Sequence, residues 1–290
     1  MSQSVLFDAP GPRARRRIMV GNVVGVLFIL GILAVIVNGL AEKGQFDAAK
    51  WDPFVEGRTW EYFMLPGLLE TLKAAGVAVV TSIVFGLVFG LGRLSSVKAI
   101  SWVAGLIVEF FRAVPVLLMM IFFYQFLSKS TPVPSSDVPF VAVVLALTLY
   151  NGSVIAELVR SGVFGLPKGQ REAGLAIGLT RSQSLRVIEI PQALVAMLPA
   201  LLSQFVVILK DSALGTFIGY TELLGFARRL ASGEGNILPA LLVTAAIFII
   251  LNMLLTFAAQ RLSRLLGARA GALLKTDEAV DPEGVPAPAR

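Results

Sequence analysis

Residues 18–40 read IMVGNVVGVLFILGILAVIVNGL, an apolar run of 23 residues without a charged side chain. A helix needs about 20 such residues to cross the hydrocarbon layer of a membrane. Further apolar runs follow at residues 74–92, 113–128, 138–156, 190–209 and 236–260, and we expect the run at 113–128 to extend back to about residue 101. The runs are too long for strands and lack the alternation of a transmembrane β-barrel. The sequence therefore predicts an all-α polytopic membrane protein with about six transmembrane helices.

The amino-acid composition supports the same fold class. Apolar residues make up 56% of the 290 residues and charged residues only 15%, whereas a soluble chain has about 45–50% and about 25%. The chain contains no cysteine and no histidine. It therefore has no disulfide, no thiolate nucleophile, no Ser-His-Asp triad and no histidine-ligated zinc. We expect a protein that is not an enzyme and that has no metal site.

The positions of the charged residues predict the direction of the helices. Arg13, Arg15, Arg16 and Arg17 precede the first run, and the positive-inside rule places such a segment in the cytoplasm. Six spans leave most of the 25 Lys and Arg residues on that side. We therefore expect a multi-pass protein of the cytoplasmic (inner) membrane with both termini in the cytoplasm. This bias accounts for the net charge of +6, so membrane lipid is an expected partner and nucleic acid is not.

Composition divides the chain into five segments. We expect residues 1–17 to form a basic cytoplasmic tail, 18–40 a transmembrane helix, 41–65 an outer loop and 266–290 a cytoplasmic C-terminal tail, with the other transmembrane helices within residues 66–265. The first 17 residues and the segment after about Thr276 are poor in apolar residues, so we expect both to be disordered. The run at 18–40 is too long for the apolar part of an ordinary signal peptide, and we expect it to remain as a helix.

The longest inner connection reads RSGVFGLPKGQREAGLAIGLTRSQSLRVIEIP from Arg160 to Pro191. Its helix formers predict two short helices, at residues 170–178 and about 181–188, the second of them ended by Pro191. We expect this helix-turn-helix to lie flat on the inner face of the membrane. Four small residues would let a groove of another protein approach the backbone of this hairpin closely: Ala173, Gly174, Ala176 and Gly178.

Polar residues inside the apolar runs are candidates for a substrate path, because ionisable groups within a membrane are costly. Lys210 and Asp211 end the fifth run, and the uncharged residues 212–221 after them predict a broken or re-entrant segment. Their opposite charges could contact a ligand that carries both a positive and a negative group; the alternative is an ordinary helix end with an ion pair. The candidate path residues are Tyr150, Asn151, Lys210, Asp211 and Ser212. Tyr150 and Asn151 fit path lining and helix packing equally well.

Two charged pairs have the three-residue spacing that places side chains on one helix face. The first pair is Glu109 with Arg112, and the second is Glu157 with Arg160. We expect both to form structural ion pairs near the ends of their helices.

The inner connection resembles the signature Glu-Ala-Ala-x3-Gly-x9-Ile-x-Leu-Pro of permease subunits of bacterial ABC importers. Glu172, Ala173, Gly178, Ile188 and Pro191 match it, and the departures, Gly174 and Ile190, conserve small size or apolar character. In that family the loop contains a coupling helix that docks into a separate ATPase subunit. The resemblance implies this role for loop 168–191, with Glu172, Ala173, Gly174, Gly178, Ile188 and Pro191 as the ATPase-coupling residues.

Further motifs resemble the histidine/glutamate/glutamine/arginine/opine branch of these permeases. They are GLLETL at 67–72, EFFRAVP at 109–115, AELVRSG at 156–162 and KDSAL at 210–214. The resemblance covers about residues 66–261 and implies a five-helix importer core with one added N-terminal helix. It implies import of a polar amino acid, with glutamate favoured.

The resemblance also implies a subunit that depends on partners. The sequence has no Gly-x4-Gly-Lys-Ser/Thr loop to hold phosphates, so a dimer of partner ATPase subunits would use the ATP and Mg²⁺, and this chain would need no cofactor. A second permease copy or a related permease, and an extracytoplasmic amino-acid-binding protein, would complete the importer. A stand-alone secondary transporter or channel is the alternative function, and a membrane anchor without a transport role is a further one. An intramembrane serine protease is disfavoured because the chain has no histidine.

Overall fold

The computed structural model describes residues 11–277, and every regular element within that range is helical. The tails predicted at residues 1–10 and 278–290 lie outside the described residues. The disorder predicted up to residue 17 is wrong for residues 12–17, because α1 (Pro12–Glu42) already begins there. Proline at the first helical position favours such a start. Likewise α12 (Ile237–Asp277) continues past residue 265 into the predicted C-terminal tail.

Within the described residues, five helical segments are long and apolar enough to cross a membrane. They are α1, the segment Gly57–Arg93, α7 (Val138–Phe164), the segment Arg181–Ile218 and Ile237–Leu265 of α12. Gly57–Arg93 consists of α3 (Gly57–Thr59), the π-helix η2 (Trp60–Met64) and α4 (Leu65–Arg93). Arg181–Ile218 consists of α9 (Arg181–Ser184), the π-helix η3 (Leu185–Glu189), α10 (Ile190–Asp211) and the 3₁₀-helix η4 (Ser212–Ile218). Shorter elements are α2 (Ala48–Trp51), η1 (Asp52–Phe54), α5 (Lys98–Ala113), α6 (Val116–Ser130), α8 (Lys168–Ala176) and α11 (Leu223–Glu234).

The predicted third span is broken in the structure. Its two halves, α5 and α6, reach the length and hydropathy of a span only together, and they are bent by 99°. Pro115 explains the break, because the residue before a proline is driven out of the α-helical region; Val114 is extended, with φ −81° and ψ 128°. The expected continuous run from about residue 101 to 128 is therefore wrong. The expectation of about six spans is confirmed when the bent pair is counted as one.

The predicted outer loop at residues 41–65 is largely helical. It contains α2, η1, α3 and η2, and the helix that enters the membrane starts at Gly57, well before residue 66. Trp60 holds this segment together, since its Nε1 donates a hydrogen bond to the carbonyl of Phe54 across 2.8 Å. Hydropathy alone did not reveal this part of the helix, because it is too polar to extend the apolar run.

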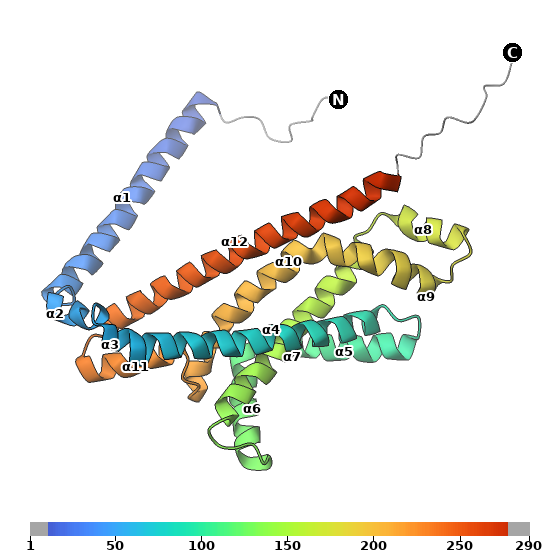
Figure 1. Cartoon of the computed structure of the whole chain (residues 1–290). Coiled ribbons are helices and arrows are strands. Elements are labelled where there is room, and N and C mark those ends of the chain that lie inside the picture. Colours follow the sequence, from blue (N-terminus) through green and yellow to red (C-terminus); the bar gives the residue numbers. More distant parts are fainter. Residues whose placement is uncertain (1–10, 278–290) are drawn as a thin grey trace.

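The central helix of the bundle is α7, which packs against α4, α5, α6 and α10 (Figure 1). Glycines bring α4 and α7 together. Gly86 of α4 lies directly against Ile155, and a Cβ at Gly90 would lie only 2.9 Å from the Cβ of Val159. Close packing of this kind holds helices together in lipid, where the hydrophobic effect between helices is weak.

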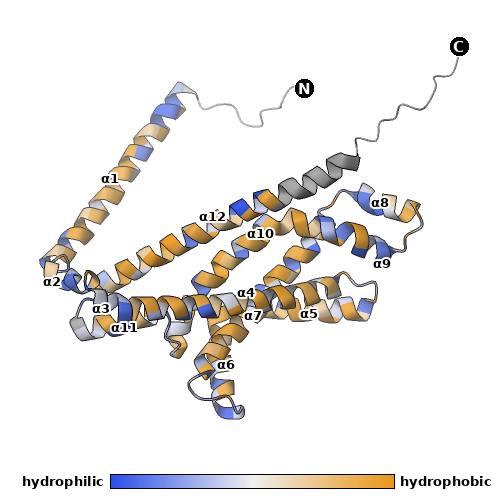
Figure 2. Ribbon diagram, viewed as in Figure 1, coloured by the Kyte–Doolittle hydropathy of each residue, from blue (hydrophilic) through white to orange (hydrophobic). Residues whose placement is uncertain are grey.

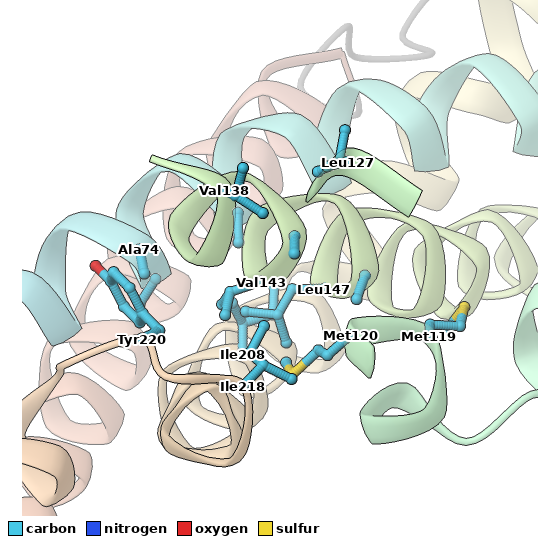
Figure 3. Close-up of a cluster of buried hydrophobic side chains, with 14 of the residues drawn as sticks. Ala74, Met119, Met120, Leu127, Val138, Val143, Leu147, Ile208, Ile218 and Tyr220 are labelled. Carbon is cyan, nitrogen blue, oxygen red and sulfur yellow. The ribbon is translucent and has the colours of Figure 1, made fainter. Parts of the chain in front are cut away.

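A buried apolar cluster joins α4, α6, α7, α10 and η4. Figure 3 shows Val143 and Leu147 of α7 in the middle of this cluster, with Ile208, Ile218 and Met120 close to them. Segments far apart in the chain therefore meet in one core beside the central helix.

Polar residues distinguish the hairpin of α8 and α9 from the long helices. Figure 2 shows hydrophilic residues gathered on α8 and α9, whereas the long helices are apolar along most of their length. We call the end with α8 and α9 the hairpin end and the end with α3 and α11 the opposite end (Figure 1). No residue of α1 is buried, so this helix presents its apolar surface on all sides, as expected for a helix added outside the core.

Candidate functional site

The α8–α9 hairpin is built by strong local signals. Its turn contains Gly178 at φ +86°, a left-handed conformation that favours glycine. The N–H of Leu179 donates to the carbonyl of Gly174 across 3.1 Å, as in a Schellman cap. Thr180 and Gln183 then form a capping box at the start of α9. The predicted helix-turn-helix is confirmed, with α8 at Lys168–Ala176.

One side of α8 packs tightly on the helix that follows it. Gly174 is buried, and a Cβ there would lie 2.7 Å from Ser184 Oγ and 3.1 Å from Ile188 Cδ1. Beside it, the carboxylate of Glu189 accepts hydrogen bonds from Ser184 Oγ at 3.2 Å and from Arg171 Nε at 3.3 Å. The expectation that Gly174 lowers the outer surface of the hairpin is therefore wrong. Its small size lets α8 approach its own neighbour.

The other side of α8 is a surface of mixed character. Glu172, Ala173 and Gly178 are exposed, and so are Leu175 at 46% and Ile177 at 75%. Large apolar side chains exposed beside charged ones favour docking of another protein. Sequence reasoning missed Leu175 and Ile177. Leu175 follows Gly174 directly and therefore points about 100° away from it around the helix, whereas Ile177 lies at the C-cap of α8. The coupling role of Glu172, Ala173 and Gly178 stays a prediction.

Pro191 does not end the second helix of the hairpin. It is the second residue of α10 and directly follows the π-helix η3, where the regular ladder of α-helical hydrogen bonds is already interrupted. The π-helix η3 joins α9 to α10, so that Arg181–Ile218 is one helical segment of 38 residues. Gln192 Nε2 also donates a hydrogen bond to Gln170 Oε1 across 3.0 Å, which links the start of α10 to α8. The predicted stop is therefore wrong, and the hairpin is structurally continuous with a transmembrane helix.

Five charged side chains from three helices form one cluster near the hairpin end. Arg93 of α4 lies 3.1 Å from Glu109 of α5 and 2.9 Å from Glu157 of α7. Arg160 lies 2.6 Å from Glu157, and Arg112 lies 3.5 Å from Glu109 and 3.7 Å from Glu157. Both predicted ion pairs are confirmed. Arg93 was missed because it belongs to another helix, and no spacing along the chain reveals that contact.

Asn151 makes a contact between helices in the middle of α7. Its side chain is fully buried, donates from Nδ2 to the carbonyl of Leu147 across 3.1 Å and accepts from Gln204 Nε2 of α10. Tyr150 is half-buried and packs against the central apolar cluster. These contacts favour helix packing as the role of both residues, and their lining of a path stays a prediction.

The interruption predicted after Asp211 is present as the 3₁₀-helix η4, which ends at Gly219 with φ +82°. Lys210 is exposed and Asp211 is half-buried. Neither belongs to any ion pair within the part of the chain that the structure describes. Ser212 is buried and donates to the carbonyl of Leu209 across 2.7 Å. A path role for the three predicted residues of this segment stays a prediction.

A buried carboxyl group lies at the opposite end. Glu222 is fully buried at the start of α11 and accepts hydrogen bonds from the N–H groups of Leu224 and Gly225, both at 2.9 Å. Burial raises the pKa of Glu222 to about 7, although these hydrogen bonds act in the opposite direction. Thr71 of α4 accepts from the N–H of Leu223 across 3.1 Å and ties α11 to α4. Sequence reasoning missed Glu222, because a capping carboxylate is not distinguished from a solvated one by its neighbours in the chain.

An apolar helical bundle with one broken span and an exposed hairpin at one end is the architecture of a membrane subunit of a transport system. Among the described residues, no group of three or more acidic side chains is placed to hold a metal ion. The chain belongs to the family of binding-protein-dependent transport system inner membrane components, whose sequence model matches residues 82–268. The matched range includes the hairpin and the charged cluster.

Individual relatives agree with this family. The glutamate transport system permease protein GluD of Corynebacterium glutamicum is 50% identical over 244 residues, which cover 84% of this chain and 89% of that protein. The probable glutamine ABC transporter permease protein GlnP of Bacillus subtilis is 34% identical over 203 residues, 69% of this chain and 92% of that one. The crystal structure of an amino acid ABC transporter with histidines matches with a TM-score of 0.65 at 29% identity, covering 74% of this chain and 98% of the other. An inward-facing structure of the MetNI methionine ABC transporter has a TM-score of 0.61 at 23% identity, covers 73% and 99%, and supports the fold alone.

Proposed function

We propose that this chain is the membrane-spanning permease subunit of an ATP-driven importer of a polar amino acid, with glutamate as the favoured substrate. The observation that carries the proposal is the 50% identity over 244 residues to a glutamate transport permease. Relatives whose names include glutamine and arginine support the broader class of polar amino acids.

In this proposal the hairpin end faces the cytoplasm and docks into a dimer of ABC ATPase subunits, which use the ATP and Mg²⁺. The arginines at positions 13, 15, 16 and 17 support this orientation, because positive residues favour the cytoplasmic side. A second copy of the chain or a related permease forms the other half of the path. An extracytoplasmic amino-acid-binding protein delivers the substrate at the opposite end, and both termini are cytoplasmic.

The hairpin supports coupling to an ATPase for a mechanical reason. The exposed side of α8 offers Glu172, Leu175 and Ile177 to a partner, and the buried side is linked to the segment Arg181–Ile218. A displacement of α8 is therefore passed to a helix that crosses the membrane and ends beside Gly219. ATP-driven movement of the hairpin can then favour one access state over the other, since the ATPase would bind the two states with different affinity.

Uptake of a panel of labelled amino acids tests the proposal. Cells that lack this chain should lose glutamate uptake and regain it when the chain is supplied. Glu172→Ala and Gly178→Ala should reduce uptake several-fold while ATP hydrolysis by the assembled complex continues. Gly178→Ala also strains the turn by about 1–2 kcal/mol, because alanine is disfavoured at positive φ.

Two outcomes contradict the proposal. One is glutamate flux through vesicles that contain the purified chain without an ATPase and ATP, which is the behaviour of a secondary transporter or channel. The other is unchanged uptake of every amino acid of the panel in cells that lack the chain.

A further inference from the structure

A cavity of about 650 Å³ lies at the opposite end of the bundle, far from the hairpin. It is bounded by the first half of α4, the start of α7 and the turn between η4 and α11. The chemically important residues of its wall are Glu70, Lys73, Asp137, Phe140, Tyr220 and Phe226. Its volume falls within the range of about 300–1,000 Å³ that is typical of small-ligand sites.

Tyr220 fixes one carboxylate of the cavity. Its hydroxyl donates to the carbonyl oxygen of Glu70 at 2.8 Å and to Glu70 Oε2 at 3.0 Å. Burial and the neighbouring Glu70 carboxylate raise the pKa of Tyr220 above its ordinary value, so the hydroxyl keeps its proton and remains a donor. Figure 3 shows the Tyr220 ring beside Ala74 of α4. Glu70 is therefore held in place.

Lys73, in contrast, makes only solvent-exposed contacts. Its Nζ lies 3.1 Å from Glu70 Oε2 and 4.8 Å from the centre of the Phe140 ring, but its side chain is 54% exposed. An exposed ion pair contributes little to stability, because water screens it. An incoming carboxylate can therefore attract the Lys73 ammonium group at little cost, while Glu70 stays bound to Tyr220.

The charges of the cavity match the head group of an α-amino acid. Lys73 is a cation for the carboxylate, and Glu70 and Asp137 are acceptors for the ammonium group. The rings of Phe140 and Phe226 add apolar walls. An amine without a carboxylate leaves Lys73 unused, and a keto acid leaves the two acidic residues without a cation.

The cavity is also connected to the hairpin. Tyr220 follows η4, which ends the helical segment Arg181–Ile218, and the same segment begins inside the hairpin. The contact between Tyr220 and Glu70 therefore lies at the far end of the helix that the coupling hairpin would move.

We propose that this cavity receives the transported amino acid when it enters the membrane subunit, with Lys73 binding its carboxylate and Asp137 and Glu70 its ammonium group. This inference rests on the proposed function and adds an entry site to it. None of the five candidate path residues lines this cavity: Tyr150, Asn151, Lys210, Asp211 and Ser212.

The absence of cysteine from the chain makes a direct test possible. Lys73→Cys gives the chain a single thiol, studied in the full complex with its ATPase and binding protein in lipid vesicles. We expect the KM for L-glutamate uptake to rise about tenfold, as for loss of one charge-assisted contact. Reaction with a methanethiosulfonate that carries an ethylammonium group should restore the KM, and one that carries a sulfonate should not. Lys129→Cys, at the exposed end of α6, is the control and should leave the KM unchanged.

Protection of the thiol identifies what occupies the cavity. In the complex without binding protein, millimolar L-glutamate should slow labelling of the Lys73→Cys thiol, whereas 2-oxoglutarate, which has no ammonium group for Glu70 and Asp137, should not. Protection by the binding protein alone, or an unchanged KM and labelling rate, overturns the inference. If the unmodified complex still imports glutamate in that case, the proposed function stands and only the entry site falls. If the unmodified complex imports no amino acid, both fall.

Discussion

Arg171 of α8 and Glu189 of η3 form an ion pair between a half-exposed guanidinium group and a nearly buried carboxylate. Arg171 Nε lies 3.3 Å from Glu189 Oε2, and the Glu189 side chain is only 4% exposed. Ser184 Oγ donates to the other oxygen of the same carboxylate. Because Glu189 belongs to η3, which continues into α10, this pair connects the docking helix α8 to the helix that crosses the membrane.

Arg171→Gln is expected to separate ATP hydrolysis from transport. The change removes the cation beside a nearly buried carboxylate, which costs about 1–3 kcal/mol locally and loosens α8 from η3. The number of glutamate molecules imported per ATP should fall at least several-fold in the assembled complex. Arg171→Lys keeps the charge and should retain more of this ratio than Arg171→Gln. A parallel loss of uptake and hydrolysis, or no loss at all, contradicts the role of this pair.

Glu157→Gln is expected to destabilise the subunit by about 2 kcal/mol. Glu157 is 21% exposed and balances Arg93, which is 13% exposed, together with Arg112 and Arg160. Its removal leaves partly buried guanidinium groups with too little negative charge nearby, and uncompensated buried charge is costly. Glu109→Gln is the control, because Glu109 is 57% exposed, and it should cost less than about 1 kcal/mol. Unfolding of the purified subunit in mixed micelles with a denaturing detergent measures the stability of both variants. An equal loss of stability in the two would contradict the central role of Glu157 in the charged cluster.

Gly86→Ala is expected to weaken the contact between α4 and α7. A Cβ at Gly86 would clash with Ile155 and would lie 3.0 Å from the carbonyl oxygen of Gly152. Overpacking of this kind costs about 1–3 kcal/mol. Gly76→Ala on the same helix is the matched control, because a Cβ there meets nothing within 4 Å and alanine favours the helix by up to about 1 kcal/mol. The same unfolding assay should separate the two variants, and a neutral Gly86→Ala would rule out tight packing at this site.

The long helices were predictable because the mean hydropathy of each apolar run is taken over many residues. A few polar residues within a run therefore change it little. The sequence did not predict the bend at Val114 and Pro115, since hydropathy does not record the direction of the chain. Pro191 was misjudged for a related reason. A proline breaks a regular helix, but η3 already interrupts the ladder of α-helical hydrogen bonds directly before Pro191, and η3 makes α9 and α10 continuous.

The candidate site was predictable where it depends on local spacing and not where it depends on contacts between helices. The pairs Glu109–Arg112 and Glu157–Arg160 follow from positions three residues apart. Arg93 joins them only because α4 ends beside α5 and α7. The hairpin was recognisable from its turn residues, but the direction in which Gly174 points depends on how α8 rests on η3.

Glu222 gives the subunit a predictable dependence on pH. Its pKa is raised from an ordinary 4.5 to about 7, chiefly by burial. Below about pH 4.5 the group is protonated in both the folded and the unfolded chain, and its contribution to stability is fully present. Between pH 4.5 and 7 the unfolded chain loses the proton while the folded chain keeps it, so stability falls as the pH rises. Above about pH 7 both states are ionised and the loss is complete.

Glu222→Gln isolates this effect from other titrating groups. Glutamine keeps one acceptor oxygen for the N–H groups of Leu224 and Gly225 but cannot ionise. The free energy of unfolding of the variant, minus that of the unchanged chain, should therefore increase between pH 4.5 and 7 by up to about 3 kcal/mol and then stay constant. Gly86→Ala, which removes no titratable group and acts through packing between α4 and α7, should destabilise the subunit by a similar amount at every pH. A difference between the Gln variant and the unchanged chain that stays the same from pH 4.5 to 8.5 would show that burial does not shift the Glu222 carboxyl.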